Sequence, residues 1–255
     1  MKGTVFLKPL EYNIEALGEK WRQGDKIKGT LKVKNHGPDK MVLPFLKVSL
    51  SSGNYKKIKA KDKKTWEIVF EKTLGESITV DASCEVEFSF EFTLPEDCRT
   101  TDKDGSLYLV FVDNVNKADS WPAGHIELII LPKLVLEQIL QILENFIRFK
   151  ISQTKYSKGM VEVKLSPPTS RELSHVDSLI LRIKEVDKTL NIEYLFNLRV
   201  LDMAGGTMTA EKKTKQFEQN FSSKQYTIYG DSINQDFIIE SINSILKDVK
   251  PKLLM

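Results

Sequence analysis

The sequence predicts a mainly β protein with few helices, on the strength of three features. Two segments far apart in the chain, 26–34 and 85–95, alternate between apolar and polar residues as half-buried strands do. Further short segments of strand type follow one another through the first half with no helical pattern among them, which indicates an antiparallel β-sandwich. From Leu134 the apolar residues adopt the spacing of an amphipathic helix, and strand-like segments then return.

The two alternating segments carry opposite charges on their polar faces. Segment 26–34 has lysines at its polar positions and segment 85–95 has glutamates. If the two strands are neighbours in one sheet, the two rows neutralise each other across the ladder. We expect Lys28 and Lys32 to lie opposite Glu87 and Glu91, in a pairing that fixes the strand register and binds no ligand.

Other strands of the first half are expected at 4–7, 12–15, 41–50, 65–73, 78–80, 107–112 and 125–131. In one of them, Trp66, Ile68 and Phe70 share a face, which we expect to be the core face. The uninterrupted apolar run 107–112 is typical of a strand covered on both sides.

Pro132 marks the break between two predicted domains, which span residues 1–132 and 133–255. Helices are expected near 134–147 and 234–249, because apolar residues recur there at helical spacing. The strands expected in the second domain are 148–155, 160–165, 179–183 and 192–198, with a further strand at 226–229 and a turn at 204–207.

Composition narrows the class of protein. The 38 lysine and arginine residues nearly balance 35 acidic residues, giving a net charge of +3. A nucleic-acid binder usually shows a concentrated excess of basic residues, so this balance argues against one.

No signal peptide or apolar stretch of transmembrane length is apparent. Cys84 and Cys98 flank a predicted strand about ten residues long, whose ends lie roughly 30 Å apart, so they cannot form a disulfide. A cytoplasmic location is therefore expected.

The candidates for chemistry are few. His36, His125 and His175 lie in different segments, and none has a cysteine or carboxylate at metal-ligand spacing. The pair Gly205-Gly206 is not a phosphate-binding loop. We therefore expect no catalytic residue, no cofactor and no metal site, and the prediction is a protein that is not an enzyme.

A lysine-rich stretch, residues 56–64 and hereafter the lysine loop, is the one candidate binding site. Only Asp62 opposes its lysines, which are Lys56, Lys57, Lys59, Lys61, Lys63 and Lys64. One interpretation is an anion-facing patch for lipid headgroups or an acidic or phosphorylated partner. The other is a solvated connection whose lysines discourage edge-to-edge strand pairing.

The order of these signals resembles arrestin-like proteins. Segment 24–31 opens with Gly-Asp and alternates around a second glycine, and segment 88–95 is a phenylalanine-rich strand that stops at Leu-Pro, followed by an apolar strand ending Val112-Asp113. The helix after the sandwich and the segment 176–181 resemble the bacterial sporulation-control branch of that fold. The resemblance implies two tandem antiparallel β-sandwiches with a linking helix and a C-terminal helix. It also implies a non-enzymatic adaptor or scaffold.

We therefore expect an adaptor that binds protein partners in a regulatory or trafficking role and binds no nucleic acid. Its working surface would be loops and edge strands, where unpaired backbone groups also allow self-association. The alternative is a peripheral membrane-associated protein that binds anionic lipid through the lysine loop.

Overall fold

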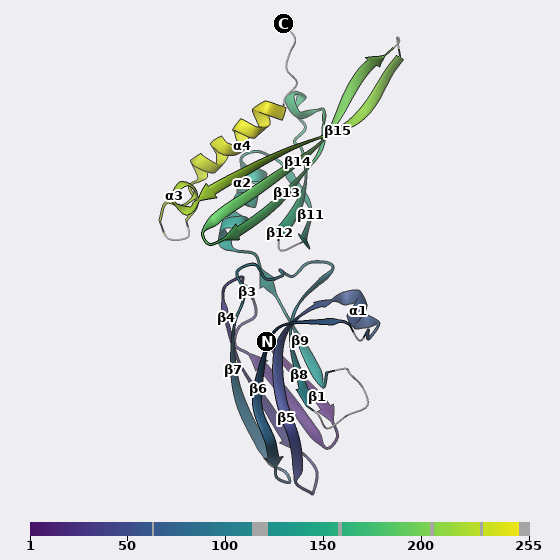
Figure 1. The fold of residues 1–255 in the computed structure, drawn as a ribbon, viewed down its shortest axis with the longest axis vertical. Helices are drawn as coiled ribbons and strands as arrows, with labels where there is room; N and C mark the ends of the chain where they lie inside the picture. The colour runs from purple at the N-terminus through teal and green to yellow at the C-terminus, as the bar shows by residue number, and fades with distance from the viewer. Residues whose placement is uncertain (63, 114–121, 158–159, 205–206, 230–231, 250–255) are drawn as a thin grey trace. The chain divides into compact units, whose positions relative to one another are not determined.

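The computed structural model describes residues 1–62, 64–113, 122–157, 160–204, 207–229 and 232–249. The chain forms two compact units, Met1–Leu131 and Pro132–Met255, each of which is described by itself. Figure 1 shows both units, with strands predominating in each.

The first unit is a sandwich of two four-stranded antiparallel sheets. The first sheet contains, in spatial order, β1 (Lys2–Leu7), β2 (Leu10–Ala16), β4 (Lys26–Asn35) and β7 (Glu85–Thr93). The second contains β6 (Trp66–Val80), β5 (Met41–Asn54), β8 (Gly105–Asp113) and β9 (Gly124–Leu128). A short parallel pair joins β3 (Trp21–Arg22) to β10 (Ile130–Leu131), and the helix α1 (Tyr55–Lys59) connects β5 to β6.

The core of the first unit lies between its two sheets. Tyr12 of β2 is fully buried and stacks on Phe111 of β8 with the ring centroids 5.4 Å apart. The Tyr12 hydroxyl donates a hydrogen bond to the carboxylate of Asp113, which is also buried. Strand β8 is buried along nearly its whole length, which confirms the prediction for 107–112. One polar bond inside an apolar core thus ties the two sheets together.

The expected charge pairing between β4 and β7 is confirmed. Lys28 lies directly opposite Glu91 and Lys32 opposite Glu87 in the antiparallel register. The lysine Nζ atoms are 3.5 Å and 3.2 Å from carboxylate oxygens of these partners. Between the pairs, a Cβ atom at Gly29 would lie 2.3 Å from the backbone oxygen of Glu15, so glycine is needed for the close approach of β2.

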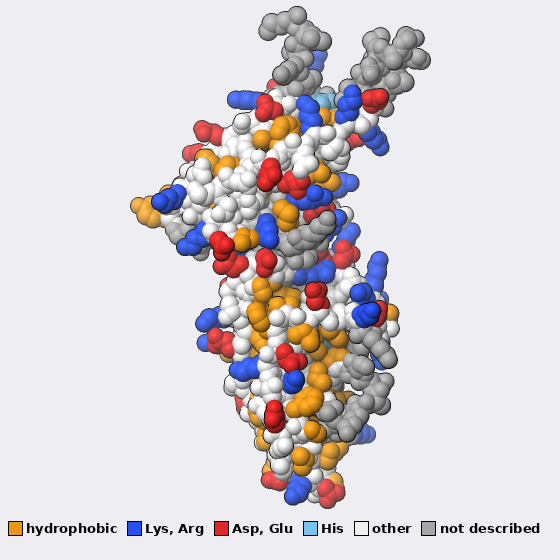
Figure 2. Space-filling view, in the orientation of Figure 1, with side chains coloured by type: hydrophobic (Ala, Val, Ile, Leu, Met, Phe, Trp, Pro, Cys, Tyr) orange, Lys and Arg blue, Asp and Glu red, His pale blue; other side chains and the backbone are white. Residues whose placement is uncertain are grey.

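Strand β6 departs from the predicted core face. Ile68 and Phe70 are 58% and 45% exposed, and Trp66 is half-buried on the outer face of the sheet. The core face predicted for Trp66, Ile68 and Phe70 is wrong, because an irregularity in the pairing with β5 leaves Val69 without a partner residue and Val69 packs against the core instead. Figure 2 shows apolar side chains at the surface along this part of the unit.

The second unit has one five-stranded antiparallel sheet with helices on one face. In spatial order its strands are β11 (Lys150–Ser157), β12 (Met160–Ser166), β13 (Val176–Val186), β14 (Thr189–Ala204) and β15 (Thr207–Ser222). Its helices are α2 (Leu134–Asn145), the short 3-10 turn Arg171–Leu173, α3 (Ser223–Tyr226) and α4 (Gln235–Val249). The backbone of β14 and β15 continues as a two-stranded ribbon beyond the last paired residue of β13 (Figure 1).

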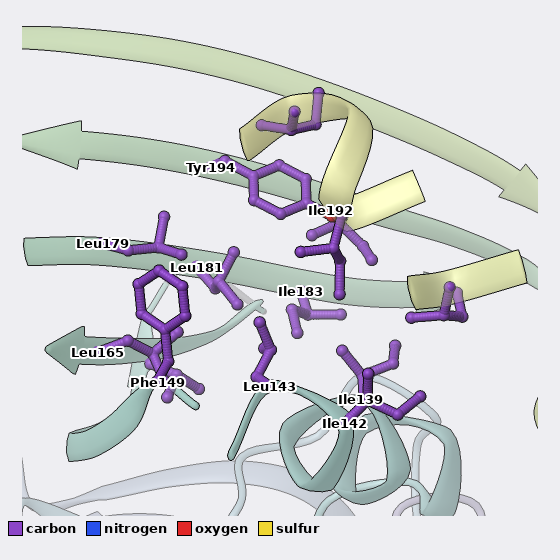
Figure 3. Close-up of a cluster of buried hydrophobic side chains, with 14 of the residues drawn as sticks. Ile139, Ile142, Leu143, Phe149, Leu165, Leu179, Leu181, Ile183, Ile192 and Tyr194 are labelled. Atoms are coloured by element: carbon purple, nitrogen blue, oxygen red, sulfur yellow. The ribbon is translucent and has the colours of Figure 1, made fainter. Parts of the chain in front are cut away.

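Helices α2 and α4 form the second layer of this unit. Ile139 and Leu143 of α2 point toward Leu181 and Ile183 of β13 in Figure 3, and α4 buries its own apolar stripe in the same cluster. The fold class is therefore confirmed as mainly β and antiparallel, with a linking helix and a C-terminal helix. It differs from two sandwiches in that helices replace the second sheet here, because both are amphipathic enough to cover one sheet face.

The opposite face of this sheet is polar and internally paired. Glu162 of β12 accepts from Lys155 Nζ at 2.7 Å and from Arg182 Nε at 2.9 Å. Arg182 also reaches Glu193 of β14 at 3.3 Å. Burial acts to raise the pKa of Glu162, but these hydrogen bonds outweigh it and lower the pKa.

Residues 207–229 also differ from the prediction. Segment 207–222 is the long edge strand β15, and the segment expected as a strand, 226–229, begins at the last residue of α3. Apolar residues are sparse in β15, and most of its described side chains are exposed, so its sequence pattern is weak. The turn expected at 204–207 falls partly outside the described residues, since 205 and 206 are among those omitted.

Two further findings concern the cysteines and the helices. Cys84 is exposed and Cys98 is buried, and both are free thiols, as expected.

Among the described residues, no helix combines the length and the apolar character that crossing a membrane requires.

Candidate functional site

The lysine loop is a short capped helix followed by a turn, where the sequence predicted a polar, lysine-rich connection. The side-chain oxygen of Asn54 accepts hydrogen bonds from the backbone amides of Lys56 at 3.0 Å and Lys57 at 3.4 Å. This is the usual arrangement of an N-terminal helix cap. At the other end, the amide of Lys61 donates to the carbonyl oxygen of Ile58 at 3.1 Å. The loop therefore has a defined local structure.

Asp62, the one acidic residue of the loop, holds the turn together. One oxygen of its side chain accepts from the backbone amide of Lys64 at 2.9 Å, and its carbonyl accepts from the amide of Thr65 at 3.1 Å. Lys63 lies outside the described residues. Asp62 forms no ion pair with a described lysine of the loop, and its one negative charge is opposed by six lysines within 56–64.

Five lysines of the loop are exposed, and in the described part of the chain none of them forms an ion pair: Lys56, Lys57, Lys59, Lys61 and Lys64. Basic side chains gather over α1 in Figure 2. This contrasts with β4, where Lys26, Lys28 and Lys32 are all paired with glutamates of β7. The loop is thus a site of uncompensated positive charge on a protein whose charges are otherwise closely balanced.

Two hydrogen bonds of Tyr55 fix helix α1 to the second sheet and to the loop that precedes β8. The backbone amide of Tyr55 donates to the carbonyl of Asp104 at 3.1 Å, and its hydroxyl donates to the Glu127 carboxylate at 2.5 Å. Tyr55 and Ile58 are half-buried, while the lysines between and after them are exposed. The helix therefore turns its apolar side toward the sheet and its lysines toward solvent.

A cavity of about 590 Å³, hereafter the α1 cavity, lies between the helix and the sheet. It is lined by Tyr55, Lys56, Ile58, Lys59, Tyr108, His125 and Glu127. Two ring contacts continue its wall, because Trp66 lies 5.1 Å from both Tyr108 and His125, centroid to centroid. A Cβ at Gly53 would approach the Tyr108 ring to 2.9 Å and the Trp66 ring to 3.0 Å, so glycine allows both rings to lie over β5.

The rings of the α1 cavity are uncharged at neutral pH. Burial lowers the pKa of His125, although Glu127 acts in the opposite direction. Burial, together with Glu127, raises the pKa of both tyrosine hydroxyls, Tyr55 and Tyr108. The charged groups that line the cavity are consequently Lys56, Lys59 and Glu127, and the Tyr55 hydroxyl already occupies one oxygen of Glu127.

The histidines and cysteines are not brought together. His36 contacts Glu11 at 2.5 Å on the first sheet, His125 belongs to the α1 cavity, and His175 lies 3.0 Å from the carbonyl oxygen of Val249 in the second unit. Within the residues that the structure describes, no group of three histidine, cysteine or acidic side chains could hold a metal ion.

Sequence reasoning identified the lysines but missed the cavity beside them. Tyr108 was expected in the core as part of an apolar run, and His125 and Glu127 had no recognisable spacing with residue 55. In the antiparallel register Tyr108 lies opposite Glu127, and Val110 opposite His125. This register, which brings the lining residues onto one outer face, was the missing information.

Comparisons with known proteins support the fold. No protein-family model matches the chain, and no curated protein matches it in sequence. Its structure is similar to that of Spo0M, a sporulation control protein from Bacillus subtilis, with a TM-score of 0.69 and 16% sequence identity. The match covers 95% of this chain and 99% of Spo0M. The chain thus has the arrestin-like fold in the form found in Spo0M, which confirms the predicted resemblance at the level of fold.

Two further solved structures are much less similar. They are the alkylpurine DNA glycosylase AlkC from Pseudomonas fluorescens, with a TM-score of 0.33, and the CARDB domain of a Pyrococcus furiosus protein, with a TM-score of 0.28. Each is 12% identical to this chain and covers 48% of it. At these scores neither likeness bears on function.

Proposed function

We propose that this chain is a non-enzymatic, cytoplasmic adaptor or scaffold that binds a protein partner in a regulatory or trafficking role. The fold it shares with a sporulation control protein, along nearly the whole of both chains, supports a regulatory role. Fold alone does not determine function, so the proposal depends on a surface of this chain. That surface is the lysine loop.

The observation that carries the proposal is the group of five exposed lysines that lack ion pairs within the described residues. Elsewhere in the first unit, exposed lysines on β4 face glutamates across the ladder. Like charges held near one another repel, and a partner of opposite charge relieves that repulsion. The capped helix positions these charges before any partner arrives, which lowers the entropic cost of binding.

A second candidate function is peripheral association with an anionic membrane through the same loop. A cluster of lysines attracts anionic lipid headgroups with about 1 kcal/mol for each lysine near the surface. Such binding falls steeply as the salt concentration rises, because the charges are solvent-exposed.

The two functions are separated by capture from native lysate and by vesicle sedimentation. One variant replaces the described lysines of the loop by glutamine: Lys56, Lys57, Lys59, Lys61 and Lys64. A matched control variant replaces five lysines elsewhere in the first unit, with the same change of charge: Lys8, Lys20, Lys34, Lys40 and Lys72. Light scattering on all three proteins reports self-association.

The adaptor proposal expects a specific protein that wild type and the control variant retain and that the loop variant loses. Retention by the loop variant equal to that of wild type would move the working surface elsewhere and refute the site. If wild type retains no protein but sediments with phosphatidylserine vesicles, and the loop variant does not, the membrane function replaces the adaptor function.

A further inference from the structure

The α1 cavity identifies the chemistry of the partner more closely than the lysines do. We infer that the cavity binds one bulky apolar or aromatic side chain, presented by an acidic segment of the partner protein. This inference rests on the proposed adaptor function and deepens it. It combines three observations: the size and walls of the cavity, the charges beside it, and the direction in which α1 turns its apolar residues.

Size and walls favour an apolar or aromatic side chain. The cavity, about 590 Å³ in volume and open to solvent, has room for the largest side chains. The uncharged part of its lining consists of Ile58 and the rings of Tyr55, Tyr108 and His125. A bulky apolar or aromatic side chain would gain ring contacts and remove apolar surface from water there.

The charges beside the cavity favour acidic neighbours for that side chain. Lys56 and Lys59 line the cavity itself. Lys57, Lys61 and Lys64 extend the positive surface along the helix and the turn that follows. The one carboxylate of the lining, Glu127, is outnumbered by Lys56 and Lys59, so the lining carries a net positive charge. An anchor with carboxylates on either side therefore complements both the cavity and its surroundings.

The placement of the apolar side chains of α1 favours a protein segment over a lipid surface as the binding partner. A helix that binds a membrane projects apolar side chains outward into the headgroup region. Here Tyr55 and Ile58 line the cavity together with Lys56 and Lys59, and the remaining residue of the helix, Lys57, is exposed. Among the described residues of 55–65, no large apolar side chain is exposed. The site is a concave pocket with charged surroundings, which a projecting side chain can enter and a flat bilayer cannot.

The test uses fluorescein-labelled synthetic peptides as probes and the full chain as receptor, with fluorescence anisotropy as the readout. The first peptide has a central tryptophan flanked by glutamates, the second has glycine in place of the tryptophan, and the third has glutamines in place of the glutamates. We expect the first to bind about tenfold to a hundredfold more tightly than the second, from burial of the aromatic ring. We expect the third to bind weakly.

Two variants locate the binding. Ile58→Asp places a carboxylate on the cavity wall. We expect it to reduce the affinity for the tryptophan peptide to the affinity for the glycine peptide. Val42→Asp makes the same substitution at an apolar residue that is 53% exposed on β5 and does not line the cavity, and it should leave both affinities unchanged. In the wild-type protein, the ring protons of His125 should shift in the NMR spectrum when the tryptophan peptide is added.

Three results would overturn the inference. They are equal affinities for the tryptophan and glycine peptides, no shift of the His125 signals, or binding of phosphatidylserine vesicles in place of the peptides. The adaptor proposal is tested separately. If capture from lysate depends on the loop lysines and not on Ile58, the adaptor proposal stands and the cavity inference fails.

Discussion

Replacing Tyr12 by phenylalanine is expected to destabilise the first unit by about 1.5–3 kcal/mol. The ring stays in place, because phenylalanine keeps the stacking on Phe111, and only the hydroxyl is lost. Its partner, the Asp113 carboxylate, is 8% exposed and then lies in the core without that donor. A hydrogen bond to a charged group contributes about 1.5–3 kcal/mol, and the cost of leaving such a group unsatisfied is of the same order.

The assay is urea unfolding followed by tryptophan fluorescence. All three tryptophans of the chain, Trp21, Trp66 and Trp121, belong to Met1–Leu131, so the signal reports the first unit. The control is Tyr194→Phe in the second unit, where the hydroxyl donates to the Gln219 side chain at 2.9 Å. That control should leave the tryptophan-detected midpoint unchanged.

The pH dependence gives a second readout with a definite sign. Burial, and next the hydrogen bond to Asp113, raise the pKa of Tyr12 above its ordinary value of 10.0. The folded state therefore holds this proton more tightly than the unfolded state does. The resulting stability is fully present below about pH 10 and declines as the pH rises above it. The Tyr12→Phe variant should show a shallower decline.

Two results would refute this account of Tyr12. One is a loss of less than about 0.5 kcal/mol in the free energy of unfolding, which is below the usual contribution of even a neutral hydrogen bond. The other is an alkaline decline identical to that of wild type.

Three further outcomes are expected. Lys32→Glu should lower the urea midpoint by facing Glu87 with a like charge, and adding Glu87→Lys should restore part of it; equal midpoints for the single and double variants would contradict the ladder. Iodoacetamide should modify Cys84 alone in the native protein, because burial raises the pKa of Cys98 to about 12, and mass spectrometry should find no second adduct until the chain unfolds. The amides of α4 should exchange slowly with deuterium, because its apolar stripe is buried; exchange at the rate of a free peptide would mean that the helix detaches.

Much of the fold could be predicted from the sequence, because the periodicity of a strand depends on one segment and the pairing of charges depends on only two. The lysines of β4 and the glutamates of β7 anticipated the register that the structure shows, in which Lys28 faces Glu91 and Lys32 faces Glu87. The uninterrupted apolar run indicated a strand covered on both sides, and β8 is such a strand. The change to helical spacing at Leu134 falls at the first residue of α2.

Which face of a strand other elements would cover could not be predicted from its sequence pattern. An alternating pattern states which residues share a face, but the packing of other elements decides whether anything covers that face. Ile68 and Phe70 are exposed, because an irregularity in the pairing of β6 with β5 places Val69 against the core in their stead. In the second unit, the layer opposite the sheet consists of helices, which no strand pattern could indicate.

One part of the candidate site could be predicted from the sequence, and the other part depends on the tertiary structure. The sequence by itself determined the local excess of positive charge in the lysine loop, since six lysines and one aspartate within 56–64 need no folding to be counted. Only the tertiary structure decided that a cavity lies beside them. Its lining comes from α1, β8 and β9, which are separated by tens of residues in the chain. Antiparallel pairing with a specific register brings Tyr108, His125 and Glu127 onto one outer face beneath Tyr55, and that register is set by the packing of the whole sandwich.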